Sequence, residues 1–227
     1  MKAYWNAEYR HKFDQFRKII SDQSFCIVEI GSHYGEDSLR LAETFSDSKI
    51  YCFEPDPRNT SVHRKYVDHP RISLNECAVS SQEGVQPFYQ SHSKNTSLLV
   101  PEKYGWISDS DYTSLDLHNS GASSLKSGYQ HALQETIEVP TIRFDSWCKT
   151  SKISAIDFAW IDVQGAERDV IEGMGEKVRN INYIWIEYGE MFYDGAMSRD
   201  ETVSLLASKG FSTLKNQGAS AQDLLFK

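Results

Sequence analysis

The sequence predicts an α/β protein whose central sheet is doubly wound and mainly parallel. Short apolar, β-rich segments alternate with segments of helical periodicity along most of the 227 residues. The first strand-like segment, at 25–30, runs into a glycine turn and then into a helix. The composition of 40% hydrophobic and 25% charged residues is sufficient to bury a core, which excludes a disordered chain. In such a sheet, ligands bind beyond the carboxyl ends of the parallel strands.

The remaining elements follow in order along the chain. An amphipathic helix that packs on the domain or on a partner subunit is indicated by aromatic residues at helical spacing, namely Trp5, Tyr9, Phe13 and Phe16. Apolar runs predict further strands at 49–53, 71–79, 85–90, 136–144, 155–162 and 182–187. Helical periodicity predicts helices at 36–45, 57–66, 165–174 and 199–209. Two last segments, 211–214 and 223–226, predict a closing hairpin.

The segment 91–134 lacks periodicity and is rich in polar residues. A loop of that length inside a compact domain is usually functional, so we expect it to form the acceptor side of a cleft. Its aromatic rings suit stacking on a sugar or polyketide face, and they are Tyr104, Trp106, Tyr112 and Tyr129. No stretch reads as a linker. The expected organisation is therefore a helical extension at 1–24 and one domain at 25–227 that carries 91–134 as an insertion.

The charge and the cysteine content limit the classes of partner and the cellular location that we expect. The chain has 24 Lys+Arg and 32 Asp+Glu, a net charge of −8, which argues against nucleic acid as a partner. Its four cysteines include no C-x-x-C pair, which argues against a zinc site and against a secreted disulfide framework. No apolar run approaches the roughly 18 residues of a membrane span. We expect a cytoplasmic protein, and the N-terminal aromatic stripe would also serve a homodimer.

The glycine turn and a nearby acid indicate a nucleoside-containing ligand. Gly31 and Gly35 let backbone approach a ligand closely at the start of a helix. Position 33 is His, where a dinucleotide fingerprint requires Gly, so a nicotinamide cofactor is disfavoured. Glu29 suits a cationic or amino-bearing ligand. Glu54 ends the second strand, 23 residues after Gly31, where a carboxylate can accept both ribose hydroxyls.

Several motifs together resemble a known family, the FkbM-type S-adenosylmethionine-dependent O-methyltransferases within the class I methyltransferases. The resemblance spans about 27–226 and rests on VEIGSHYG at 28–35, CFEP at 52–55, AVS at 78–80, GASSL at 121–125 and DFAWIDVQGAE at 157–167. The family usually has D-x-I-K-I-D-V-E-G-A-E in the last motif. Trp160 therefore stands where a Lys is common, and Gln164 where a Glu is common.

The resemblance implies a Rossmann-like sheet of seven strands and S-adenosyl-L-methionine as the cofactor. It also implies the residues that bind this cofactor. Those at the methionine end are Glu29, Gly31 and Gly35, with Ser32, His33 and Ser38 nearby. Those along the rest of the cofactor are Glu54 and Pro55 at the ribose, Cys77, Ala78 and Val79 at the adenine, and Asp162 beside the transferred group.

Asp162 is the expected catalytic residue because it lies at the carboxyl end of the strand predicted at 155–162, where acids face the cleft. Its alternative role is to cap the helix that begins near residue 165. Glu187, at the end of the next strand, is the second catalytic candidate, and a divalent cation (Mg²⁺ or Mn²⁺), if used, would be held by these two acids. The alternative bases are His92, His118 and His131.

The resemblance implies transfer of a methyl group to a hydroxyl of a saccharide or natural product. The departures at Trp160 and Gln164 leave a second hypothesis open, in which the chain is a non-catalytic S-adenosylmethionine-binding or interaction module of the same fold. Intact acids and glycines at the motif positions favour the enzyme.

Overall fold

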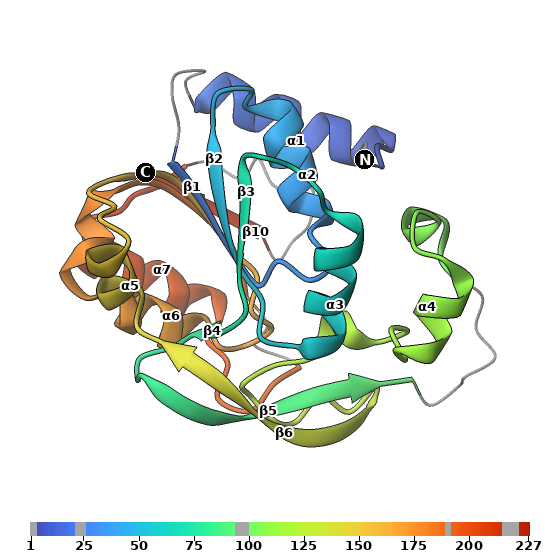
Figure 1. Ribbon diagram of the computed structural model, residues 1–227. Coiled ribbons are helices and arrows are strands. Elements are labelled where there is room, and N and C mark those ends of the chain that lie inside the picture. Colours follow the sequence, from blue (N-terminus) through green and yellow to red (C-terminus); the bar gives the residue numbers. More distant parts are fainter. Residues whose placement is uncertain (1–3, 21–25, 94–99, 189–191, 215–222) are drawn as a thin grey trace.

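The computed structural model describes residues 4–20, 26–93, 100–188, 192–214 and 223–227. A seven-stranded sheet in the order β3-β2-β1-β7-β8-β10-β9 forms its centre (Figure 1). β1 pairs in parallel with both β2 and β7, whereas β10 runs antiparallel to β8 and β9. The strands are β1 (Cys26–Ile30), β2 (Lys49–Phe53), β3 (Ile72–Asn75), β7 (Ile156–Ile161), β8 (Ile181–Glu187), β9 (Thr213–Leu214) and β10 (Asp223–Phe226). The predicted doubly wound sheet with a closing hairpin is confirmed.

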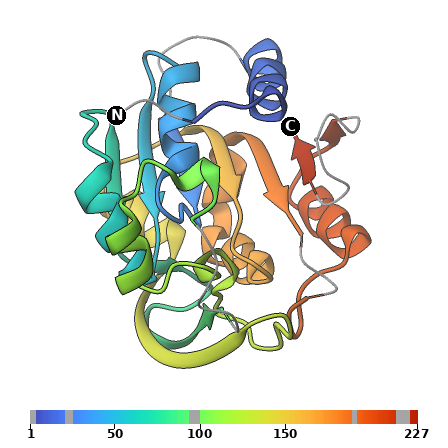
Figure 2. The same ribbon diagram turned by 90° about the vertical axis from the view of Figure 1, so that its right-hand side faces the viewer.

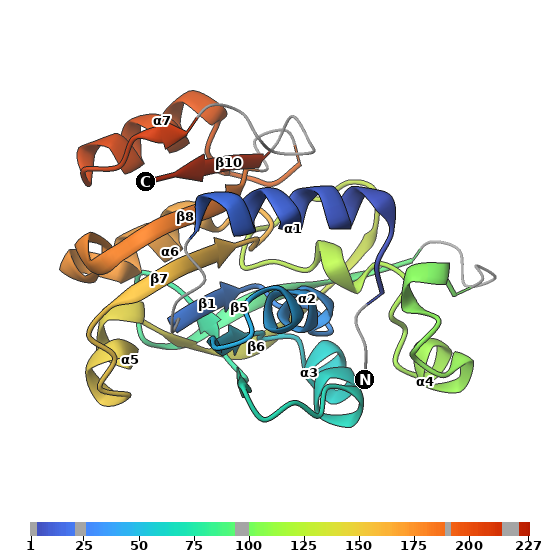
Figure 3. The same cartoon turned by 90° about the horizontal axis from the view of Figure 1, so that it is seen from above.

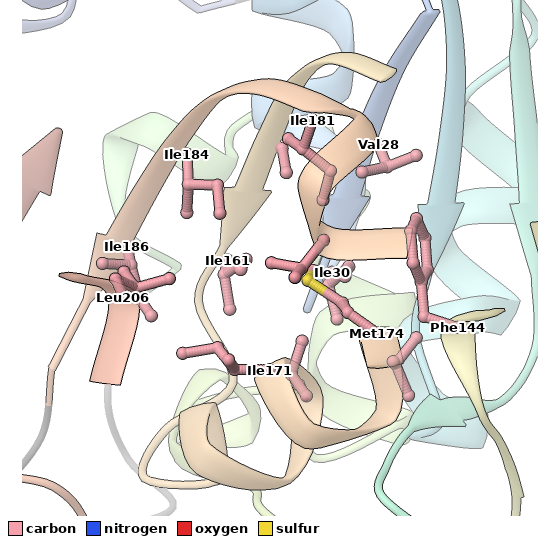
Figure 4. Packing of buried hydrophobic residues seen from close by; sticks show 14 of the residues in the cluster. Val28, Ile30, Phe144, Ile161, Ile171, Met174, Ile181, Ile184, Ile186 and Leu206 are labelled. Atoms are coloured by element: carbon pink, nitrogen blue, oxygen red, sulfur yellow. The ribbon is translucent and has the colours of Figure 1, made fainter. Parts of the chain in front are cut away.

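Helices cover both faces of this sheet, which is why its strands are apolar on both sides. On one face, α1 (Ala7–Ile19) and α2 (Glu36–Thr44) pack against each other and against Ile27 of β1 (Figure 3). On the other face, Val28 and Ile30 pack against α5 (Phe144–Thr150), α6 (Glu167–Met174) and α7 (Arg199–Ser208) (Figure 4). Successive residues of β1 thus supply two separate cores.

The N-terminal helix belongs to the first of these cores. Asn6 caps α1 by accepting the Tyr9 amide, and Phe13 and Phe16 are buried. The Phe13 ring stacks on Trp160 of β7, with ring centroids 5.6 Å apart. The aromatic stripe therefore packs on its own domain, as the sequence allowed. Among the described residues, no helix is long and apolar enough to cross a membrane.

A second, smaller sheet corrects the prediction of one strand at 71–79. β3 ends at Asn75, the Cys77 amide closes a turn on the Asn75 carbonyl, and the chain enters a three-stranded sheet in the order β4-β6-β5. Its strands are β4 (Ala78–Val79), β5 (Gly84–His92) and β6 (Leu133–Ile142). An apolar run predicts extended backbone but not which sheet it joins, since pairing is decided by distant partners.

The insertion is also more structured than the sequence predicted. It contains η1 (Glu102–Tyr104), α4 (Asp109–Ser114) and η2 (Ser120–Ala122), and α4 lies beside α3 (Pro57–Tyr66) (Figure 2). Tyr104 and Tyr112 pack in a cluster with Tyr34, and Tyr112 is fully buried there, so it is unavailable for stacking on an acceptor, which corrects that expectation for Tyr112. Elements this short show no periodicity, because each contributes only one or two residues to the shared core.

Candidate active site

A cavity of about 400 Å³ lies at the carboxyl ends of β1, β2, β7 and β8. Its walls also come from α1, α2 and the insertion, which contributes Lys103, Tyr104, Ser120, Gly121, Ser123 and Leu125. This is the edge at which a parallel sheet presents strand ends, as the sequence predicted. Part of 91–134 therefore does border the cleft, while 94–99 lies outside the described residues.

Gly31 closes the floor of the cavity between β1 and β7. Its φ is +89°, and a Cβ built on it would lie 1.7 Å from the Asp162 carbonyl oxygen. The Asp162 amide donates to the Ile30 carbonyl at 2.9 Å, and the Gly31 amide donates to the Phe53 carbonyl at 2.9 Å. Only a residue without a side chain lets the three strand ends meet this closely. Gly35 also has a positive φ, of +86°, and starts α2.

Glu29 is buried in the cavity wall, and no described residue forms an ion pair with it. The Ser38 hydroxyl donates to its carboxyl, and the Cys52 thiol lies 3.7 Å from it. Burial, with a smaller contribution from Asp37, raises the pKa of Glu29 well above its usual range. A ligand that brings a positive charge would reverse part of this shift, so the site is suited to an ammonium group.

Glu54 is fixed at the end of β2 by three donors. The His33 amide donates to Oε2 at 2.9 Å, while the Asp56 amide and the Asn59 side chain donate to Oε1 at 2.9 and 3.2 Å. Burial, followed by the nearby Asp56 charge, raises the pKa of Glu54 to about 7. Ser32 is also buried in the cavity wall, and its hydroxyl has no hydrogen-bond partner among the described residues. An unpartnered hydroxyl in a cavity wall is a group that a polar ligand would complete.

The other predicted cofactor residues divide into two groups. Pro55, Ala78 and Val79 line the cavity, whereas Cys77 lies outside it, in the turn before β4. The His33 ring is hydrogen-bonded through Nδ1 to Glu36 Oε1 at 2.9 Å and through Nε2 to the Ser120 hydroxyl at 3.0 Å. It therefore connects the glycine turn to the insertion. Sequence reasoning missed Phe88 and Leu125, which form an apolar wall with Ala78. No sequence signal marked Phe88, because the second sheet was not predicted, whereas Leu125 ends the GASSL motif at 121–125.

Asp162 and Glu187 meet at the ends of the adjacent strands β7 and β8. The Glu187 carboxyl is hydrogen-bonded to that of Asp162, whose Oδ1 also accepts from Gln164 at 2.6 Å. The Asp162 charge, together with burial, raises the pKa of Glu187 to about 9. Burial also raises the pKa of Asp162. The two carboxyls therefore titrate as a coupled pair, in which the raised pKa of Glu187 favours its protonated form near neutral pH.

The alternative roles considered for this region find no support in the geometry. Ala166 is the N-cap residue of α6 and no side chain caps the helix, so Asp162 is not a helix cap. None of the three candidate histidines is among the cavity-lining residues. His92 is bound to Asp116 at 2.6 Å, while His118 and His131 pack against tyrosine rings.

Two further groups that the sequence did not single out line the cavity beside these acids. Lys12 of α1 reaches the cavity from outside the predicted domain. Trp160 and Trp185 stack on each other with ring centroids 4.0 Å apart, and both line the cavity. The helical periodicity of 4–20 accounted for the packing face of α1 but not for a cation at its edge.

The family model for the methyltransferase FkbM domain matches residues 29–213. The 2-O-methyltransferase NoeI of Sinorhizobium fredii is 32% identical over 187 residues, which cover 80% of this chain and 71% of that protein. Methyltransferase 1 of Beauveria bassiana is 24% identical over 84% of this chain and 73% of its own length. An S-adenosylmethionine-dependent methyltransferase structure from Aquifex aeolicus aligns with a TM-score of 0.49 at 9% identity, covering 97% of this chain and 92% of that one.

Proposed function

The chain belongs to the FkbM methyltransferase family and is an S-adenosylmethionine-dependent O-methyltransferase, and from this premise we propose that its acceptor is a hydroxyl of a saccharide, free or as part of a natural product. The observation that carries the proposal is the pair of hydrogen-bonded carboxyls, Asp162 and Glu187, in a cavity beside the buried Glu54. The name of the relative from S. fredii places its own transfer at a 2-hydroxyl. The non-catalytic alternative is not favoured, because these relatives are methyltransferases.

The described residues fit the cofactor along one side of the cavity. Glu29 would hold its ammonium group, Glu54 would accept hydrogen bonds from its ribose hydroxyls, and the unpartnered Ser32 hydroxyl would be free to bind one of its polar groups. Ala78 and Val79, with the apolar wall beyond them, suit the adenine. When bound, S-adenosylmethionine supplies a methyl group on a positively charged sulfur, and it leaves as S-adenosylhomocysteine.

The acceptor then lies on the opposite side, against the carboxyl pair. The Asp162 carboxylate takes the proton of the acceptor hydroxyl, whose oxygen forms the bond to the methyl carbon as the carbon–sulfur bond breaks. Glu187 keeps its own proton and holds the Asp162 carboxylate in place through their hydrogen bond. Gln164, itself held by the Tyr193 hydroxyl at 2.9 Å, fixes the other side of Asp162. Orientation of this kind contributes on the order of 7–11 kcal/mol to lowering a two-reactant barrier.

A divalent cation does not fit the donors at this place. The described residues contain no group of three His, Cys, Asp or Glu side chains that could hold a metal ion. The Asp162 and Glu187 carboxyls are hydrogen-bonded to each other, and the raised pKa of Glu187 favours its protonated form. A carboxyl that keeps its proton is a poor ligand for a hard cation, which prefers ionised carboxylate oxygens. We therefore route no step through Mg²⁺ or Mn²⁺.

Chelation is accordingly expected to leave the reaction unchanged. Turnover after treatment with EDTA should stay within about twofold of the untreated rate, because proton transfer to a side-chain carboxylate requires no Lewis acid. The turnover rate is measured by the release of S-adenosylhomocysteine. Loss of turnover that Mg²⁺ or Mn²⁺ restores would instead make Asp162 and Glu187 metal ligands.

The pKa of Glu54 predicts a pH dependence of cofactor binding. The ionised carboxylate accepts the ribose hydroxyls, so affinity for S-adenosylmethionine should be constant above about pH 7 and fall by about tenfold per unit below it. Glu54→Gln should weaken binding at pH 8 by about 1.5–3 kcal/mol, the cost of a lost charged hydrogen bond, and should flatten this part of the profile. Calorimetry from pH 5.5 to 8 tests both.

The exposed Glu83→Gln is the matched control for this experiment. It removes the same charge far from the cavity and should reproduce the wild-type profile. Equal affinity of wild type and Glu54→Gln at pH 8 would remove Glu54 from the cofactor site.

The acceptor class is tested with labelled S-adenosylmethionine and a panel of methyl glycosides of neutral sugars, each paired with its 2-deoxy counterpart. Label should enter at least one parent sugar and not its 2-deoxy partner. Label in both members of a pair would move the transfer to another hydroxyl. Label in no sugar, with transfer to a non-saccharide alcohol, would overturn the saccharide proposal.

A further inference from the structure

Lys12 carries a positive charge from the N-terminal helix into the cavity. Its side chain is only 13% exposed, and Nζ lies 3.6 Å from Asp223 Oδ2. The same nitrogen lies 4.4 Å from the ring centroid of Trp160 and 3.9 Å from that of Trp185. A lysine that sits on two aromatic faces and is largely removed from water is held there by its charge, since packing alone would leave the ammonium in solvent.

The groups around the carboxyl pair come from every element packed against it. They are Lys12 from α1, Asp37 from α2, Asp223 from β10, Glu167 from α6, Tyr193 after β8, and the Gln164 amide. Asp223 and Asp37 add negative charge, which favours protonation of the pair. Lys12 is the cation whose charge lowers the pKa of both Asp162 and Glu187. Asp37 is paired with Arg40 at 2.5 Å, and Lys126 lowers the pKa of Glu167, whereas Lys12 is the cation that acts on the carboxyl pair itself.

Position 160 gives an independent reason for the placement of Lys12. The family motif commonly has a lysine there, whereas this chain has Trp160, whose ring lines the cavity and lies beneath the Lys12 ammonium. Trp185, stacked on it, has an indole nitrogen that is buried and has no hydrogen-bond partner among the described residues. The two rings thus form a base for a cation and leave one donor free for a ligand.

We propose that Lys12, which precedes the matched family domain, is a positioning residue of the acceptor site: its ammonium, held on the Trp160–Trp185 pair and 3.6 Å from Asp223, supplies positive charge in the cavity that Asp162 and Glu187 line. The N-terminal helix is then part of the active site. This inference rests on the proposed role of Asp162 as the base that receives the acceptor proton.

The experiment compares four full-length variants with the wild type. Lys12→Met keeps an unbranched stem over the two rings and removes the charge, and Lys12→Gln does the same with a polar end. Lys12→Arg keeps the charge. Lys18→Met, at an exposed position of the same helix, is the matched control. Thermal unfolding checks that each variant is folded, and either neutral variant is sufficient for the test.

The first readout needs no acceptor. Carboxyl ¹³C chemical shifts of Asp162 and Glu187 are titrated in the complex with S-adenosylhomocysteine. Loss of the positive charge of Lys12 should raise the apparent pKa values of the Asp162–Glu187 pair by about one unit in Lys12→Met and Lys12→Gln. Lys12→Arg and Lys18→Met should superimpose on the wild type. A neutral Lys12 variant that titrates like the wild type would overturn the inference.

The second readout is the pH profile of kcat on whichever sugar the wild type methylates. Its acidic limb should move by about one unit to higher pH in the two neutral variants, so that turnover falls by up to about tenfold on that limb and recovers at higher pH. Lys12→Arg should restore the wild-type limb. A loss that is equal at all pH values would make Lys12 merely structural. If the wild type methylates no sugar, the proposed acceptor class fails, while the ¹³C titration still decides the role of Lys12.

Discussion

Asp162→Asn is expected to lower turnover by about 10²–10⁴-fold while leaving the protein folded. The amide has the size of the carboxyl, can still accept from Gln164, and can donate to Glu187, so the hydrogen bonds at the ends of β7 and β8 are kept. What is lost is the charge that receives the acceptor proton. Because the Asp162 charge is the main reason that Glu187 stays protonated, the pKa of Glu187 should fall in this variant. Release of S-adenosylhomocysteine from the complete reaction measures the rate.

Asp157→Asn is the matched control for this loss. Asp157 lies at the opposite end of the same strand, where it accepts the Cys26 amide at 2.9 Å, and it does not line the cavity. It should keep wild-type turnover, even if stability declines slightly. A folded Asp162→Asn protein with near-normal turnover would show that the base lies elsewhere. The double variant with Glu187→Gln then reveals whether Glu187 had replaced it.

Gly31→Ala is expected to abolish cofactor binding and to destabilise the fold by on the order of 3–5 kcal/mol. The new Cβ would lie 1.7 Å from the Asp162 carbonyl, and backbone at the centre of a sheet cannot move aside as a flexible side chain could. The ends of β1 and β7 must separate, which breaks the hydrogen bond from the Asp162 amide to the Ile30 carbonyl. The melting temperature should fall by on the order of 10 °C.

Gly210→Ala separates this steric effect from backbone strain. Gly210 has a φ of +99°, close to the +89° of Gly31, but a Cβ there would meet nothing within 4 Å. It should cost only the strain of a left-handed residue, about 1–2 kcal/mol, and leave calorimetric binding of S-adenosylmethionine intact. Equal loss of stability in the two variants would mean that strain, and not the contact between β1 and β7, makes Gly31 necessary.

The parts of the structure that were correctly predicted are those whose signal is local. α3 follows Asp56, which caps it, and Pro57, which suits its first turn, and the predicted range 57–66 is the observed helix. β2 ends at Phe53, immediately before Glu54 and Pro55, again as predicted. Glycines and acids at strand ends could be placed because a strand and the turn after it are contiguous in the chain. For these elements, propensity and tertiary structure agree.

The sequence by itself determined the parallel sheet, the glycine turn and the placement of Glu54 and Asp162 at strand ends, because hydrophobic periodicity and turn residues act over a few neighbouring positions. Only the tertiary structure decided that the strand expected at 71–79 divides between two sheets, that Asp162 and Glu187 are hydrogen-bonded, and that Lys12 lines the same cavity. Each of these depends on side chains distant in sequence that meet in a buried, weakly screened environment. There, pairing partners and charge interactions are set by geometry that no local pattern encodes.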